Sequence, residues 1–235
     1  MKAVILAAGA GTRLRPMTNE VPKAMIPING KPMLEILLEQ LKTINITEVV
    51  IIVHYLKDKI IDHFGNGSNF GMNIQYEEQK EMLGTADAVM HAEPHISEDK
   101  FILVFCDSLF ETDQLKRLLE HKNADGVFTV REVKNPSRFG VILTKGKKVT
   151  NFIEKPKELV SNLASFSVFL MPKDIFSACK KIPKGPAGEY WLTDAIQLLI
   201  DQGTIFEYEI SKHILDIGTH EQYKEAQELA KKLQL

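Results

Sequence analysis

Residues 2–14 read Lys2-Ala3-Val4-Ile5-Leu6-Ala7-Ala8-Gly9-Ala10-Gly11-Thr12-Arg13-Leu14. A short apolar run leads directly into a turn that contains two glycines. The run predicts a buried first strand over residues 2–8, and the glycines predict a tight turn that allows the backbone N–H groups to approach a ligand closely. In open α/β sheets, ligands collect at the carboxyl ends of the strands. This segment therefore predicts both a sheet and a binding site at its edge.

The first half of the chain alternates between strand and helix patterns. Strands are predicted over residues 2–8, 48–54, 73–78 and 101–106, and helices over residues 33–44, 57–64, 86–92 and 113–122. This rhythm favours a parallel sheet covered by helices and joined by right-handed crossovers.

The second half is richer in strands. Strands are predicted over residues 126–133, 140–144, 149–153, 164–170, 205–210 and 214–217, and helices over residues 193–202 and 219–233. We expect Thr193 or Asp194 to cap the first of these helices, and a capping box from Thr219 to Gln222 to begin the second. We find no linker or repeat, and expect a single domain over residues 1–235, with halves at about 1–122 and 123–235.

Composition excludes several classes of protein. The chain has 235 residues, of which 44% are hydrophobic, and its 29 Lys and Arg against 31 Asp and Glu give a net charge of −2. It has enough apolar material for a core, and too little positive charge to bind nucleic acid through bulk attraction. No run approaches the ~20 apolar residues of a membrane helix, and the first apolar run is too short for a signal peptide. The two cysteines form no CxxC pair, and we expect a cytoplasmic protein.

The glycine-rich turn at residues 9–13 predicts a phosphate site. Gly9 and Gly11 would leave backbone N–H groups open to an anion, and the guanidinium of Arg13 suits phosphate oxygens. The alternative is that the glycines only form a tight turn. A Walker loop is excluded because no Lys-Ser or Lys-Thr follows, and a dinucleotide fingerprint because Leu14 stands where a third glycine is needed.

Three further charged residues follow apolar segments. Lys23 lies between two prolines, where a poorly solvated ammonium would seek an anion, although it could be an ordinary loop lysine. Asp107 directly follows the strand predicted over residues 101–106, and Asp216 follows another apolar run. Carboxylates beside phosphate oxygens are a usual environment of Mg²⁺. Asp107 could instead be a turn or helix cap, and Asp216 could be a plain acid at a helix N-terminus, where Thr219 is the better cap.

Two more segments carry polar groups at strand ends. Glu154 and Lys155 could bind a sugar hydroxyl and a phosphate, or could form a solvated strand end. The amide of Gln79 fits the base edge of uracil or thymine. Gly84 would let backbone groups reach that base, unless Gly84 and Thr85 form only a polar turn and helix cap.

Together and in this order, these motifs resemble the sugar-1-phosphate nucleotidyltransferases, also called NDP-sugar pyrophosphorylases. The resemblance covers the chain from Lys2 to about Tyr223. It is carried by Gly9-Ala10-Gly11-Thr12-Arg13-Leu14, Pro22-Lys23, Phe139-Gly140-Val141, Glu154-Lys155-Pro156, Leu192-Thr193-Asp194 and Asp216-Ile217-Gly218-Thr219. The fold that it implies is a Rossmann-like three-layer α/β/α sandwich with a mostly parallel mixed sheet.

The resemblance also implies a reaction and a role for each site residue. A sugar 1-phosphate would attack the α-phosphorus of a nucleoside triphosphate, UTP or dTTP, and pyrophosphate would leave. The sugar would be glucose 1-phosphate or a relative. The nucleotide would be bound by Leu6, Ala8, Gly9, Gly11, Thr12, Arg13, Gln79, Gly84 and Thr85. The catalytic residues would be Arg13, Lys23 and Asp107, the Mg²⁺ ligands Asp107 and Asp216, and the sugar-phosphate ligands Gly140, Glu154 and Lys155. A cationic pocket is expected, as is assembly into a homo-oligomer.

Other functions remain open. The same fold could transfer GTP to mannose 1-phosphate or use CTP as a cytidylyltransferase, and a non-catalytic nucleotide-sugar sensor would keep the fold without the reaction. The chain departs from the family at Ser165-Phe166-Ser167, where many relatives have Asn-Ala-Gly. Sugar recognition is therefore the least defined part of the prediction.

Overall fold

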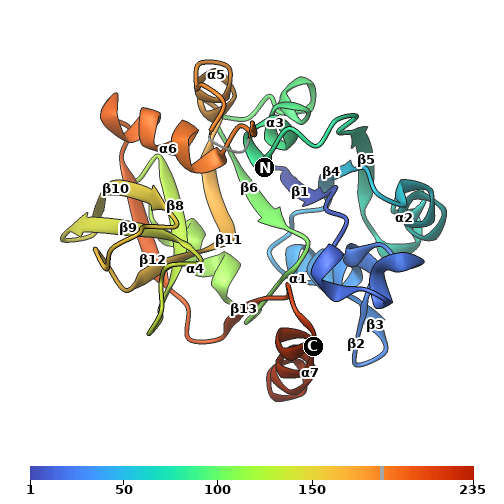
Figure 1. The fold of residues 1–235 in the computed structure, drawn as a ribbon. Helices are drawn as coiled ribbons and strands as arrows, with labels where there is room; N and C mark the ends of the chain where they lie inside the picture. Colours follow the sequence, from blue (N-terminus) through green and yellow to red (C-terminus); the bar gives the residue numbers. More distant parts are fainter. Residues whose placement is uncertain (186–187) are drawn as a thin grey trace.

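The computed structural model describes residues 1–185 and 188–235 (Figure 1). Its centre is a nine-stranded mixed sheet in the order β5-β4-β1-β6-β11-β8-β12-β10-β9. The strands are β1 (Ala3–Ala7), β4 (Glu48–Val53), β5 (Asn73–Glu78), β6 (Lys100–Phe105), β8 (Gly126–Glu132), β9 (Gly140–Lys145), β10 (Lys148–Glu154), β11 (Leu163–Pro172) and β12 (Phe206–Ile210). The pairings make seven strands run one way, with β10 and β11 opposed. The expected mostly parallel mixed sheet is confirmed.

Two short strand pairs lie outside the main sheet. One joins β2 (Pro27–Ile28) to β3 (Lys31–Pro32), and the other joins β7 (Ser108–Phe110) to β13 (Ile214–Asp216). The second pair matters for the site, because it places Asp216 opposite Ser108, immediately beside Asp107. Residues more than 100 positions apart are thereby brought together.

Helices cover both faces of the sheet, which gives the three layers. The helices are α1 (Met33–Thr43), α2 (Lys57–Phe64), α3 (Thr85–Met90), α4 (Gln114–Glu120), α5 (Ile175–Cys179), α6 (Leu192–Asp201) and α7 (His220–Leu233). One core cluster joins the sheet to α1, α2 and α4, and a second joins its other face to α3, α5 and α6. A third cluster packs α7 against the β2–β3 hairpin and β13 (Figure 1).

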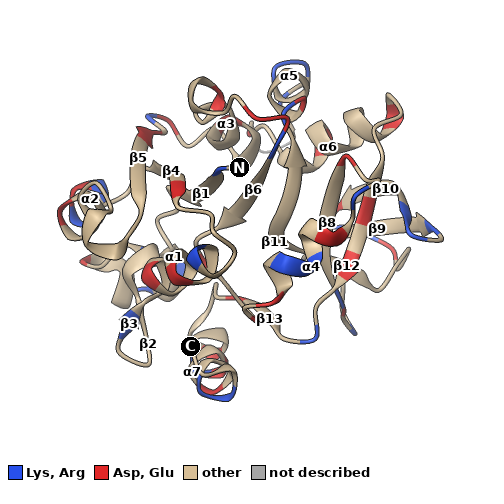
Figure 2. Ribbon diagram, turned by 180° about the vertical axis from the view of Figure 1, so that it is seen from behind, with Lys and Arg blue, Asp and Glu red and all other residues tan. Residues whose placement is uncertain are grey.

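The predicted helices and strands are all present, with ends within two residues of those expected. The central strands consist almost entirely of uncharged residues, and the charged residues gather on helices, loops and strand ends (Figure 2). The sheet crosses both halves of the chain, because β6 of the first half pairs with β11 of the second. The single domain over residues 1–235 stays a prediction. Within the described residues, no helix combines the length and the apolar character that crossing a membrane requires.

The predicted cap of α6 is wrong. The first residue of the helix is Leu192, and its N–H donates to the hydroxyl oxygen of Thr85, 3.0 Å away. Thr193 lies one position inside the helix and donates its own hydroxyl to Glu154. The sequence could not show this arrangement, because the true partner is 107 residues distant. At α7, the prediction is confirmed: the oxygen of Thr219 accepts from the N–H of Gln222.

Candidate active site

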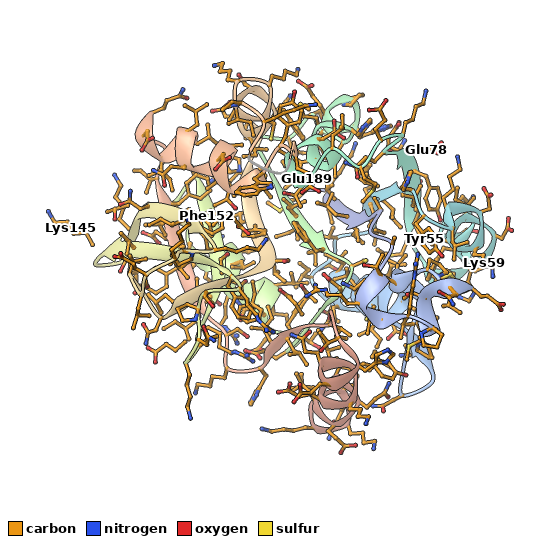
Figure 3. All side chains as sticks on the ribbon, viewed as in Figure 1. Tyr55, Lys59, Glu78, Lys145, Phe152 and Glu189 are labelled. Atoms are coloured by element: carbon orange, nitrogen blue, oxygen red, sulfur yellow. The ribbon has the colours of Figure 1, made fainter. Side chains whose placement is uncertain are left out.

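The carboxyl ends of the central strands meet at one cavity of about 430 Å³. β1 and β6 are parallel neighbours, with Leu6 opposite Phe105. The residues that follow them, from Ala8 and from Cys106 onward, therefore emerge at the same edge of the sheet. The volume lies in the range of small-molecule sites. Figure 3 labels two lining residues, Phe152 on β10 and Glu189 ahead of α6.

The cavity gathers twelve of the fifteen predicted site residues. They are Leu6, Ala8, Gly9, Lys23, Gln79, Gly84, Thr85, Asp107, Gly140, Glu154, Lys155 and Asp216. The strand ends and loops that supply them are spread over more than 200 positions of sequence. Gly11, Thr12 and Arg13 do not line the cavity. The guanidinium of Arg13 lies beside Gly218, where an added Cβ would be 2.9 Å from its Nη2 atom.

The glycine-rich turn is fixed by contacts behind it. Gly11 has a φ of +61°, and a Cβ there would come within 3.0 Å of the Thr18 methyl group. The Thr18 hydroxyl donates to the carbonyl oxygen of Gly11 over 2.9 Å. A Cβ on Gly9 would meet no heavy atom of the described chain within 4 Å. The two glycines thus differ: Gly11 is required by packing, and Gly9 keeps the cavity wall open.

Three charged side chains meet on the side of the cavity formed by β1 and β6. The ammonium of Lys23 forms an ion pair with Asp107, and the hydroxyl of Ser108 donates to Asp216 over 2.7 Å. Burial alone would lower the pKa of Lys23. The negative charges of Asp107 and Asp216 outweigh this effect, and the pKa is raised above its ordinary value. Burial and the charge of Asp107 raise the pKa of Asp216 to about 7. The two carboxylates therefore repel each other across a short distance.

The opposite side of the cavity carries Glu154 and Lys155. One oxygen of Glu154 accepts a hydrogen bond from Thr193 over 2.7 Å, and the other lies 3.2 Å from the ammonium of Lys155. The pKa of Asp194 is raised by burial and by the charge of Glu154. Gly140 has no room for a side chain, since a Cβ would lie 2.5 Å from the ring of Phe152. This side is therefore built around one fixed carboxylate.

The expectation of a cationic pocket is wrong. The charged residues that line the cavity are three basic ones, Lys23, Arg138 and Lys155, and four acidic ones, Asp107, Glu154, Glu189 and Asp216. A site with this balance would repel two phosphorylated molecules unless a cation joined them. The pair Asp107 and Asp216 offers the hard oxygen ligands that such a cation needs.

Several lining residues were not predicted from the sequence. Trp191 lines the cavity, and the ammonium of Lys155 lies 5.9 Å from the centroid of its ring. Ser165 also lines it, with a buried hydroxyl that has no hydrogen-bond partner among the described residues. The motif Leu192-Thr193-Asp194 pointed to this neighbourhood, but the contact of Thr193 with Glu154 depends on tertiary structure that spacing does not show.

Comparison with known proteins finds similar sequences over nearly the whole chain. A family described as nucleotidyl transferase matches residues 2–232. The chain is 40% identical to the UTP–glucose-1-phosphate uridylyltransferase AglF of Haloferax volcanii, covering 97% of this chain and 96% of that protein. It is 38% identical to the bifunctional protein GlmU of Methanococcus maripaludis, over 93% of this chain, and spans about half (51%) of that relative.

Solved structures match over nearly the whole chain. A putative glucose-1-phosphate thymidylyltransferase from Bacillus anthracis, in complex with a sucrose, aligns with a TM-score of 0.87 and 28% identity, covering 98% of this chain and 95% of that one. A UDP-glucose pyrophosphorylase complexed with UDP-glucose aligns with a TM-score of 0.84 and 24% identity, covering 98% of each chain. Because only 24% of residues are identical, the second structure shows a similar fold and nothing further.

Proposed function

The chain belongs to the nucleotidyl transferase family, and from that membership we propose that it joins UTP or dTTP to glucose 1-phosphate or a related sugar 1-phosphate. The products are pyrophosphate and an NDP-sugar. The observation that supports this proposal most strongly is that one cavity is lined by twelve of the residues to which the family resemblance assigns nucleotide, sugar phosphate or metal. The identity to AglF over nearly the full length of both chains supports UTP and glucose 1-phosphate in particular.

The reaction needs no nucleophile from the protein. A phosphate oxygen of the sugar 1-phosphate attacks the α-phosphorus of the triphosphate, a new P–O bond forms, and the bond to the pyrophosphate breaks in line. The attacking oxygen is already anionic, so no proton has to be removed from it. Burial raises the pKa of the neighbouring Cys106 thiol to about 12, so this group stays protonated and is a poor nucleophile.

The work of the protein is to align two anions and reduce their repulsion. The raised pKa keeps Lys23 charged, and its ammonium lies at the carboxyl edge of the sheet, where the α-phosphate would bind. Gly9 leaves that wall of the cavity open to phosphate oxygens. Arg13 lies outside the cavity lining, beside Gly218, and we assign it to the departing pyrophosphate at the rim.

Asp107 and Asp216 are proposed to hold Mg²⁺, with phosphate oxygens and water as the remaining ligands. When bound, the ion would neutralise phosphate charge and polarise the α-phosphoryl group. The fit rests on the two mutually repelling carboxylates and on the acidic excess of the lining. The ammonium of Lys23 is paired with Asp107, and it would be available to contact phosphate if that carboxylate held Mg²⁺.

The sugar phosphate is assigned to the opposite side of the cavity. The carboxylate of Glu154, held by Thr193, can accept hydrogen bonds from sugar hydroxyls, and Lys155 can pair with the phosphate. The hydroxyl of Ser165, which has no partner among the described residues, offers one more polar contact in the position where many relatives carry asparagine. The ring of Trp191 adds an apolar surface for the sugar.

A pyrophosphate-release assay tests the proposal. The purified chain is incubated with Mg²⁺, each of UTP, dTTP, GTP and CTP, and a panel of sugar 1-phosphates. We expect pyrophosphate with UTP or dTTP and glucose 1-phosphate, and none when Mg²⁺ is chelated. Release only with GTP and mannose 1-phosphate would move the chain to the guanylyltransferases. If no pair releases pyrophosphate, the result favours the alternative of a non-catalytic nucleotide-sugar sensor. The two free, buried cysteines support a cytoplasmic setting, and homo-oligomer formation stays a prediction.

A further inference from the structure

The amide of Gln79 is held in one orientation. Gln79 follows β5, lines the cavity and is only 2% exposed. Its nitrogen Nε2 donates to the carbonyl oxygen of Gly84 over 3.0 Å and to Oδ2 of Asp87 over 2.8 Å. An amide nitrogen has two hydrogens, and these two contacts use both.

Asp87 is the stronger of the two restraints. It lies in the first turn of α3, and its side chain is 14% exposed. A carboxylate can only accept hydrogen bonds, and a bond to a charged acceptor is about twice as strong as one to a neutral acceptor. The carbonyl of Gly84 already accepts a bond from the N–H of Ala88.

A flipped amide is therefore disfavoured. It would turn the oxygen Oε1 of Gln79 toward the carboxylate of Asp87 and the carbonyl of Gly84, and leave three acceptors facing one another without a proton between them. In the observed orientation, Oε1 accepts no hydrogen bond from any described residue. Gln79 thus offers a ligand in the cavity an acceptor and no donor.

We propose that Asp87 sets the choice of base, by fixing the amide of Gln79 so that only its oxygen is available to the nucleotide. This inference rests on the proposed function and deepens it. Uracil and thymine carry an N–H at position 3, which can donate to that oxygen. Cytosine has a lone pair at position 3, which would face the oxygen of Gln79 without a proton. Asp87 is not among the residues that line the cavity, so it is a positioning residue.

The expected discrimination follows from hydrogen-bond energies. Leaving a buried acceptor without its partner costs about 1–3 kcal/mol, which corresponds to roughly 5- to 160-fold in kcat/KM. We therefore expect the native chain to favour UTP over CTP by about 100-fold. Replacing Asp87 by asparagine removes the charge and allows the new side chain to present its own NH₂ to Gln79. The carbonyl of Gly84 remains, so selectivity should fall without disappearing.

The test compares kcat/KM for UTP and for CTP, at saturating glucose 1-phosphate and Mg²⁺, in the native chain and in D87N. We expect the UTP to CTP ratio to fall at least tenfold in D87N, mainly because the CTP reaction improves. D87A is measured beside it and should also lower the ratio. The matched control is D62N, which removes an exposed aspartate from α2. It should keep the native ratio.

The outcomes separate this inference from the function on which it rests. If the native chain favours UTP and folded D87N and D87A keep the native ratio, the role of Asp87 is wrong and the proposed function stands. If the native chain favours CTP, the orientation argument is wrong. If the native chain releases no pyrophosphate with either nucleotide, the proposed function fails first. A loss of rate that is equal for UTP and CTP would show a purely structural role for Asp87 and overturn the inference.

Discussion

At the scale of single residues, the proposed reaction depends most on Lys23. Its side chain is only 12% exposed, it is paired with Asp107, and its pKa is raised rather than lowered in spite of burial. A lysine whose only role is packing buries its methylene groups and leaves its ammonium in water. Here the ammonium is held inside the cavity beside the proposed metal ligands.

Replacing Lys23 by methionine should reduce kcat by about 100- to 1,000-fold, the usual effect of removing one preorganised group that stabilises transition-state charge. Methionine keeps most of the side-chain volume, so the fold should survive. Steady-state kinetics of pyrophosphate release measure the effect, and circular dichroism checks folding. Replacing the exposed Lys116 on α4 by methionine is the control and should leave kcat unchanged. A K23M enzyme within threefold of native kcat would remove Lys23 from the mechanism.

At the scale of elements, the glycine-rich turn depends on a neighbour that the sequence motif does not include. The hydroxyl of Tyr55, which follows β4, lies 3.0 Å from the carbonyl oxygen of Thr18 and 3.1 Å from that of Asn19. Thr18 in turn donates to Gly11. Tyr55 lies beside the segment that contains the turn (Figure 3). The turn is therefore anchored to β4 through Thr18.

Replacing Tyr55 by phenylalanine should raise the KM for the nucleoside triphosphate about three- to tenfold, because one hydrogen bond that holds the turn is worth about 1 kcal/mol. The kcat should change less than twofold, since no reacting group is removed. Tyr76→Phe is the matched control: its hydroxyl donates to the carbonyl of Gly65 over 2.7 Å, outside the turn. Equal KM values in the two variants would mean that Tyr55 contributes only general stability.

The contact between Thr85 and α6 shows how two helices on one face of the sheet are joined. The oxygen of Thr85, the first residue of α3, accepts the N–H of Leu192, the first residue of α6. Thr85→Val should lower the free energy of unfolding by about 1 kcal/mol, as for the loss of an N-cap. Urea titration measures it. Thr47→Val, at an exposed position, should stay within about 0.5 kcal/mol of the native value, and an equal loss in both would contradict the capping role.

These contacts also mark the limit of what the sequence could predict. β1 and β6 were predictable because their apolar runs need no partner to be recognised, and Asp107 was predictable because it directly follows such a run. α5 has five residues, too few to show a helical period, and the strands of the β2–β3 hairpin have two each. Asp87 and Trp191 were missed because their roles arise from contacts with segments far away in the sequence.

At the scale of the whole molecule, one sheet supports two cores. Cys106 belongs to the cluster beneath α1, α2 and α4, and Cys179 to the cluster beneath α3, α5 and α6. They also fall in the two halves of the chain, on either side of residue 122. Burial raises the pKa of each thiol to about 12, so neither is a thiolate at pH 8 in the folded protein. The two cysteines therefore report separately on the two cores and the two halves.

If the chain is a single cooperative domain, both thiols should become reactive at the same urea concentration. Native protein at pH 8 should react with iodoacetamide at a negligible rate, and unfolding should return both thiols toward their ordinary pKa of about 8.5 and expose them together. Mass spectrometry of the alkylated peptides measures the two midpoints independently, with a circular dichroism titration as the reference for global unfolding. The pairing of β6 with β11 couples the halves through the centre of the sheet, which is why we expect coincident midpoints. Labelling of Cys179 at a clearly lower urea concentration than Cys106, or the reverse, would show that the surroundings of one cysteine open separately and would contradict a single cooperative domain.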